Sequence, residues 1–316
     1  MGNVWQSVSN LLTKSERRLA VTSTTKQIER RPVDININKK AILNLFNETH
    51  KNPPFSPKIW SGTFSEYSNT NVVAVLATPK SGSTYITNVI INHANIPFKR
   101  LCYAYSSNEH DLYLPALMTA KATGGVSQLH MRATPHNVQL MNSFDIKGII
   151  LVRNIFDAVV SFRRDIQKKL NANHLGLGVT GYSFVWLNKE LNKLSEEELT
   201  DYCIDFYVPW YLNFILSWEN YRNNKRYLFV RYEELMENKS STVAKIMKHI
   251  GEKEFVNKKI LERDYLKNSA HISGTRSAIG SGYDTLTEIQ VEKIKKKFNY
   301  FDFQNLEEYL GFDSQI

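Results

Sequence analysis

VVAVLATPKSGSTYITNVI, residues 72–90, is the stretch that decides the fold. Its first six residues are all apolar, which is typical of a buried strand. After the segment Pro79 to Thr84, apolar side chains recur at the spacing of one helix face, at Tyr85, Ile86, Val89 and Ile90. A strand that runs through a short turn into an amphipathic helix predicts the opening of a strand–turn–helix unit.

The turn itself has the composition of an anion site. Backbone N–H groups at a helix N-terminus point toward a ligand, and the helix dipole adds positive potential there. Lys80 adds a full charge, and Gly82 lets the backbone approach a phosphate closely. In the nucleoside triphosphate loop GxxxxGK[ST] the lysine follows the glycine and a Mg²⁺-binding hydroxyl comes next. Here Lys80 precedes Gly82, so the turn departs from that loop.

Outward from this stretch, short apolar runs alternate with helical patterns. GIILV at 148–152 and YLFV at 227–230 are strand candidates, and GVSQL at 125–129 is a weaker one. The alternation predicts an α/β fold with a parallel sheet and crossover helices. Helices are expected over much of 181–224, over 240–250 and over 287–298, and an irregular loop rich in Ser and Gly is expected over 268–283.

Composition places the chain among ordinary globular proteins. Of 316 residues, 42% are hydrophobic and 22% are charged, which excludes disorder, collagen and coiled coil. One domain of this length buries roughly three quarters of its unfolded surface, so no disulfide or structural metal is required. Cys102 and Cys203 are far apart and lack metal-ligand spacing, as expected in a reducing compartment. We expect an N-terminal extension or lid over 1–70 and a single domain over 71–316.

Basic side chains outnumber acidic ones by 40 to 31, a surplus of nine that favours anionic partners. Residues 1–40 hold eight basic and three acidic side chains, so more than half of the surplus lies in an N-terminal arm. A nucleic-acid interface would need a basic stripe interleaved with aromatics, so none is expected. The longest apolar runs have five or six residues, against the ~18 of a membrane span. With no secretory signal at its start, the chain is expected to be cytoplasmic, without a membrane partner.

Three segments share a further resemblance. A strand followed by TPKSGSTY is similar to the 5′-phosphosulfate loop of sulfotransferases that use 3′-phosphoadenosine-5′-phosphosulfate (PAPS). LVRNIFDAVVSFRRD resembles the 3′-phosphate motif of that family, with Arg153 at a strand end and Ser161 eight residues later. YLFVRYEEL resembles the segment that places a tyrosine, here Tyr232, near the adenine. The resemblance spans 72 to about 297 and implies a three-layer parallel sheet flanked by helices, the P-loop-like sulfotransferase fold.

The same resemblance extends to a C-terminal loop that closes over the 3′-phosphate. GTRSAIGSGYD resembles it through Thr275, Arg276 and Ser277, although Ala278 stands where the family usually has its first glycine. The family likeness implies that the N–H groups of the turn hold the 5′-phosphate and that Lys80 reaches the oxygen bridging phosphate and sulfur. The turn residues concerned are Ser81, Gly82, Ser83, Thr84 and Tyr85.

The catalytic base implied by the resemblance is His130 in SQLHMRATPHN. Imidazole suits this task because its ordinary pKa leaves much of it neutral and able to accept a proton. Gln128 stands where the family usually has lysine. His136, six residues after His130, is the competing candidate for the base, and it is interpreted instead as a surface or capping residue.

The predicted function is sulfuryl transfer from PAPS to a hydroxyl or amine of a small molecule, with release of PAP and without a metal. The acceptor pocket is expected among the aromatic side chains of 181–221 and the loops near Tyr103, Tyr105 and 130–135. The protein is expected to be a monomer or homodimer. Two alternatives stay open: a nucleotide-dependent kinase, and a non-catalytic relative that binds PAPS or PAP.

Overall fold

The computed structural model describes residues 71–103, 108–171, 186–187, 189–252, 258–262, 279–301 and 310–311. Within them, a parallel sheet has the strand order β2-β1-β3-β4. The strands are β1 Val72–Ala77, β2 Gly125–Leu129, β3 Lys147–Val152 and β4 Tyr227–Arg231. The structure thus confirms all four strand predictions, including the weak one.

The central position of β1 in the sheet explains why its sequence is entirely apolar. β1 is hydrogen-bonded to β2 on one side and to β3 on the other, and all six of its side chains are buried. A strand covered on both faces reads as a continuous apolar run because neither face meets water. Its alternate residues belong to two separate cores: Val72, Ala74 and Leu76 face one, and Val73, Val75 and Ala77 face the other.

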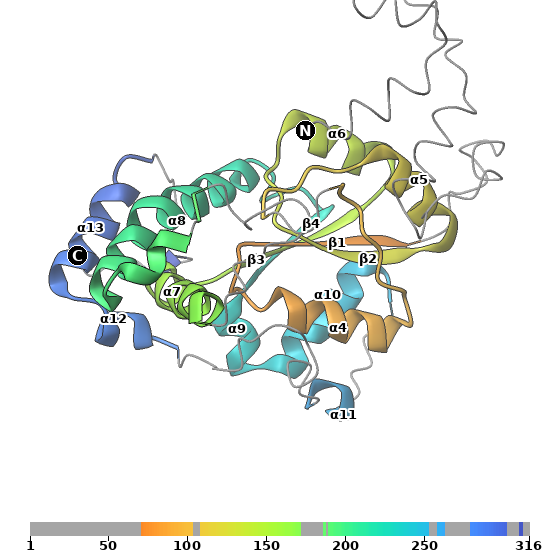
Figure 1. Cartoon of the computed structure of the whole chain (residues 1–316). Helices are drawn as coiled ribbons and strands as arrows, with labels where there is room; N and C mark the ends of the chain where they lie inside the picture. The colour runs from red at the N-terminus through yellow and green to blue at the C-terminus, as the bar shows by residue number, and fades with distance from the viewer. Residues whose placement is uncertain are drawn as a thin grey trace, which may run out of the picture. The chain divides into compact units, whose positions relative to one another are not determined.

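Helices cover both faces of the sheet and complete three layers (Figure 1). The smaller core lies under α4 Ser83–Ala94, α10 Lys239–Ile250 and the short α11 Lys258–Leu261. The larger core lies under α5 Leu114–Thr123, α6 Pro135–Ser143, α7 Ile155–Asn171, α8 Glu196–Glu219 and α13 Glu288–Phe298. The shorter elements are the 3₁₀ helix η3 Lys189–Lys193, α9 Tyr232–Glu237 and α12 Ser281–Thr285.

Local signals at the helix ends account for the predictions that are confirmed. α13 begins with a capping box between Thr287 and Gln290, and α10 ends at Gly251 with a φ of 82°. The predicted helix within 181–224 is confirmed for α8, which begins with a capping box between Ser195 and Glu198.

The prediction of an irregular loop over 268–283 is wrong for its last three residues, which form the start of α12. The Asp157 carboxylate, on α7, accepts the backbone N–H groups of Gly280 at 2.9 Å and of Gly282 at 2.7 Å. This acid takes the place of a side-chain cap. Because it lies 123 residues away from Gly280, the local sequence carries no sign of it.

Candidate functional site

The turn between β1 and α4 is folded tightly against the end of the sheet. Lys80 and Gly82 both have left-handed backbones, with φ of 71° and 83°. The hydroxyls of Thr78 and Ser81 are buried and lie 2.6 Å apart. α4 begins after Gly82 without a side-chain cap, so backbone N–H groups of its first turn are available to an anion.

Two features favour glycine at position 82: its left-handed backbone and the close approach of the Tyr232 ring. A Cβ at this position would lie 3.1 Å from the ring of Tyr232, the first residue of α9. The family resemblance implies that Tyr232 lies near the adenine, and in the structure its ring lies beside this turn. Among the other turn residues, Ser83 is buried at the start of α4, whereas the hydroxyl of Tyr85 donates to the carbonyl of Leu261 at 3.0 Å, toward α11.

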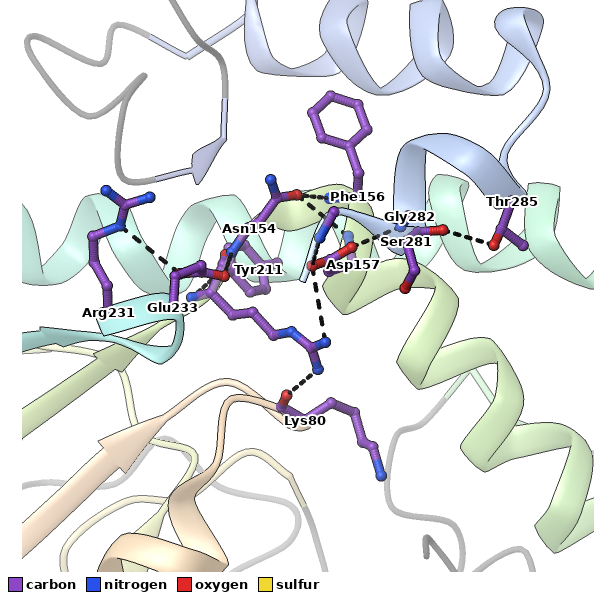
Figure 2. A network of polar contacts seen from close by, with 12 residues as sticks. Lys80, Asn154, Phe156, Asp157, Tyr211, Arg231, Glu233, Ser281, Gly282 and Thr285 are labelled. Atoms are coloured by element: carbon purple, nitrogen blue, oxygen red, sulfur yellow. Dashed lines mark hydrogen bonds and ion pairs between the residues drawn. The ribbon is translucent and has the colours of Figure 1, made fainter. Parts of the chain in front are cut away.

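Arg153 follows β3 and is only 3% exposed. Its Nη1 donates to the carbonyl of Lys80 at 2.9 Å, and its guanidinium lies 4.3 Å from the ring centre of Tyr232. Its Nη2 lies 4.0 Å from an oxygen of Asp157, an ion-pair distance without a hydrogen bond. Figure 2 shows the polar contacts that extend from Lys80 through Asp157 to Gly282 of α12.

The guanidinium of Arg153 can donate further hydrogen bonds to a ligand. Its Nε and Nη2 are buried and have no hydrogen-bond partner in the part of the chain that the structure describes. Buried donors of a charged group are costly when they are left without partners. Two unsatisfied donors in a fixed fork, beside a turn of backbone N–H groups, fit a phosphate.

Tyr211 holds the backbone of Arg153 in place. Its hydroxyl accepts the N–H of Arg153 at 2.9 Å and donates to the carbonyl of the same residue. One turn earlier on α8, the hydroxyl of Tyr207 donates to the carbonyl of Pro79 at 2.9 Å. Both tyrosines are fully buried. The sequence predicts an acceptor pocket among these aromatic side chains and gives no sign that two of their hydroxyls hold the backbone of the site in place.

Three residues of α7 line up along the site. Asp157, Ser161 and Asp165 are spaced by four and therefore share one helix face. An oxygen of Asp157 lies 4.0 Å from Nη2 of Arg153, and Asp165 accepts a hydrogen bond from the Lys80 ammonium at 3.2 Å. Ser161, predicted to contact the 3′-phosphate, therefore lies on α7 between Asp157, which is near Arg153, and Asp165, which contacts Lys80.

Sequence reasoning missed Asp165, although its spacing from Ser161 was visible. The second oxygen of Asp165 lies 2.7 Å from the ammonium of Lys169. Burial lowers the pKa of Lys80, and the attraction of Asp165 offsets only part of that shift. Burial alone would raise the pKa of Asp165, but Lys80 and Lys169 together outweigh it and hold that pKa below its ordinary value.

His130, the predicted base, follows β2 and is half-buried. Its Nδ1 lies 2.6 Å from the carbonyl of Ala77, the last residue of β1. A carbonyl only accepts, so Nδ1 carries the proton of the neutral ring and Nε2 carries the lone pair. His136 is exposed at the start of α6, whose cap is Thr134. This position agrees with the interpretation of His136 as a surface residue.

Gln128 also faces the turn. Its side-chain carbonyl accepts a hydrogen bond from the Thr84 hydroxyl at 3.3 Å, so a neutral contact occupies this position. The predicted contacts Thr275, Arg276 and Ser277 lie outside the described residues. Of the predicted site, the structure therefore brings together the turn, His130, Arg153 and Tyr232, which follow β1, β2, β3 and β4, and it places Ser161 on α7.

Comparisons with known proteins agree with this architecture. A family model described as a sulfotransferase domain matches residues 71–309. A mouse sulfotransferase solved in complex with PAP is 16% identical with a TM-score of 0.55, covering 78% of this chain and 93% of its own. Retinol dehydratase, solved with androsterone and inactive cofactor PAP, is 14% identical with a TM-score of 0.50, covering 73% and 82%. At these identities the two structures establish a shared fold. A search of curated proteins found no match.

Proposed function

Because the chain belongs to the sulfotransferase domain family, we propose that it transfers a sulfuryl group from PAPS to a hydroxyl or amine of a small-molecule acceptor and releases PAP. The observation that carries the choice of donor is the buried fork of Arg153, with two unsatisfied donors beside the turn at 79–84. Two solved structures with this fold contain PAP, which supports the same choice.

Each part of the donor has a candidate partner in the chain. The N–H groups of the turn would hold the 5′-phosphate, at Ser81, Gly82, Ser83, Thr84 and Tyr85. Arg153 and Ser161 would hold the 3′-phosphate, and the ring of Tyr232 would pack near the adenine. Thr275, Arg276 and Ser277 stay predicted contacts of the 3′-phosphate.

His130 and Lys80 would carry the chemistry. PAPS supplies an activated sulfuryl group on a phosphate leaving group. The acceptor oxygen or nitrogen bonds to sulfur as the bond from sulfur to the bridging oxygen breaks, and the acceptor proton passes to Nε2 of His130. The negative charge that develops on the departing phosphate is balanced by the Lys80 ammonium and by the backbone N–H groups of the turn.

The acceptor, assembly and location stay predictions. We propose a small acceptor, and a monomer or homodimer in the cytoplasm. Among the described residues, the search for membrane spans found no helix with the length and apolar character to cross a bilayer.

A transfer assay tests the proposal. The protein is incubated with PAPS and a panel of phenols, steroids, amines and sugars, and mass spectrometry detects sulfated products; PAP is expected to inhibit. His130→Ala is expected to lower kcat by about 100-fold or more, because general base catalysis contributes that much. Calorimetry should find PAP affinity changed less than about twofold, since the base does not hold the nucleotide.

Two outcomes would contradict the proposal. No heat of binding with PAP would remove the donor assignment, and near-normal turnover in His130→Ala would remove the base. PAP binding without transfer to any acceptor would instead favour the non-catalytic relative, an alternative that Gln128 in the usual lysine position keeps open.

A further inference from the structure

A second histidine, His110, lies against the proposed base. Its side chain is buried, with 6% exposure, and it lies 20 residues before His130 in the chain. The two rings are stacked, with centres 5.6 Å apart and planes inclined by 22°. The functional motifs of the sequence do not include His110.

Two hydrogen bonds tie these histidines together. The backbone N–H of His110 donates to the carbonyl of His130 at 3.1 Å, and the backbone N–H of His130 donates to Nδ1 of His110 at 2.8 Å. A backbone N–H only donates, so Nδ1 of His110 must present its lone pair. The neutral His110 ring therefore carries its proton on Nε2. A doubly protonated ring would set two N–H groups against each other and lose this bond.

The neighbouring ring has the opposite tautomer. Nδ1 of His130 donates to the carbonyl of Ala77 at 2.6 Å, so its lone pair is on Nε2. This tautomer requires the His130 ring to stay beside the Ala77 carbonyl. The carbonyl itself is held in place because Ala77 ends the central strand of the sheet. His110 restrains the ring on two counts: it fixes the backbone of His130 at the end of β2, and its ring limits the tilt of the imidazole that it stacks against.

We propose that His110 is a positioning residue for His130: it keeps Nδ1 of His130 on the Ala77 carbonyl and so keeps Nε2 as the nitrogen that accepts the proton. The inference rests on the proposed role of His130 in sulfuryl transfer. His110 touches neither substrate nor donor in this scheme and acts only through His130.

Two isosteric substitutions separate positioning from packing. In His110→Asn, the side-chain oxygen stands the same number of bonds from the backbone as Nδ1 and can accept the N–H of His130. In His110→Gln, the oxygen stands where Nε2 was, and that acceptor is lost. We expect His110→Gln and His110→Ala to lower kcat about tenfold through a misplaced base, and His110→Asn to stay within about threefold of the native protein.

Binding and folding controls accompany the kinetics. PAP affinity by calorimetry should change less than about twofold in all three variants, because the turn and Arg153 are untouched. His136→Gln changes an exposed histidine and should leave kcat within the same range. Thermal unfolding of each variant identifies any protein that fails to fold, and His110→Asn and His110→Gln are compared only as folded proteins.

Nitrogen-15 NMR of histidine-labelled protein reads the tautomers without any activity. The native protein and His110→Asn should show His130 protonated at Nδ1, and His110→Gln should show a mixture. An Nε2-protonated His130 in the native protein would overturn the inference, as would equal losses of kcat in the Asn and Gln variants. If the native protein shows the expected tautomers but sulfates no acceptor, the positioning stands and the proposed function fails.

Discussion

The charge of Lys80 depends on a residue that belongs to another element. Its ammonium contacts Asp165, while Lys169 and Arg153 are the nearby cations that oppose its charge. Burial lowers the pKa of Lys80, and Asp165 is the group that raises it. A lysine whose pKa is lowered loses its proton at a lower pH, so any function of the ammonium is present below that pKa and is lost as the pH rises through it.

Asp165→Asn is therefore expected to shift the alkaline limb of the pH profile of kcat/KM to lower pH. The variant removes the carboxylate that favours the ammonium but keeps burial, Lys169 and Arg153, which all disfavour it. The measurement is the rate of sulfate transfer from about pH 6 to 10, a range that lies below the ordinary pKa of lysine near 10.4, where only a lysine with a lowered pKa loses its charge.

Asp205→Asn is the matched control for this change. Asp205 also lies between two lysines, Lys293 and Lys297, at 2.9 Å each, but it belongs to the outer face of α8. The pH profile of kcat/KM of Asp205→Asn should match that of the native protein. If Asp165→Asn leaves the alkaline limb in place, then Lys80 is not the group that sets it.

At the scale of elements, α8 does more than cover the sheet. The hydroxyl of Tyr211 pairs with both the N–H and the carbonyl of Arg153. Tyr211→Phe would leave two buried backbone groups without that partner, and an unsatisfied buried group costs about 1–3 kcal/mol. We expect the free energy of unfolding to fall by about 2 kcal/mol, together with weaker PAP binding because Arg153 loses its support. Denaturant titration and calorimetry measure the two effects.

Tyr221→Phe is the comparison for that variant. Tyr221 is only partly buried, just after α8, where its ring packs near Trp218 and Tyr227. Loss of its hydroxyl should change stability by less than about 0.5 kcal/mol. Equal losses in the two variants would mean that the hydrogen bonds of the Tyr211 hydroxyl to Arg153 add no more to stability than the hydroxyl of a partly buried tyrosine.

Elements were predictable from sequence where their signal is local. The four strands and the ends of α10 and α13 follow from apolar runs, capping residues and Gly251. The start of α12 was missed because its N–H groups are satisfied by Asp157 of α7. Likewise Lys80, Arg153 and His130 could be named from motif positions. The spacing of Asp165 shows only which face of a helix it shares, and no motif includes His110. Their roles depend on contacts 85 and 20 residues apart in the chain.

At the scale of the whole molecule, the sheet order decides where these groups meet. β1 lies between β2 and β3, so the chain leaves β1 to pair first on one side and then on the other. Ligands of open parallel sheets bind at the carboxyl ends of the strands, where the strand order reverses. The turn, His130 and Arg153 follow three neighbouring strands at that edge, and their assembly there is a consequence of topology.

The same arrangement predicts that transfer proceeds without a divalent cation. Phosphoryl transfer relies on Mg²⁺ to neutralise charge between phosphates. Here the turn has Lys80 before its glycine, and Lys80 and Arg153 already direct two cations to one edge of the sheet. In millimolar EDTA, the rate of sulfate transfer from PAPS should stay within about twofold of the untreated rate. ATP with Mg²⁺ should yield no phosphorylated acceptor, which serves as the control for a kinase. A rate that collapses in EDTA and returns with Mg²⁺ would show that charge at this edge is balanced by a metal and not by the two side chains.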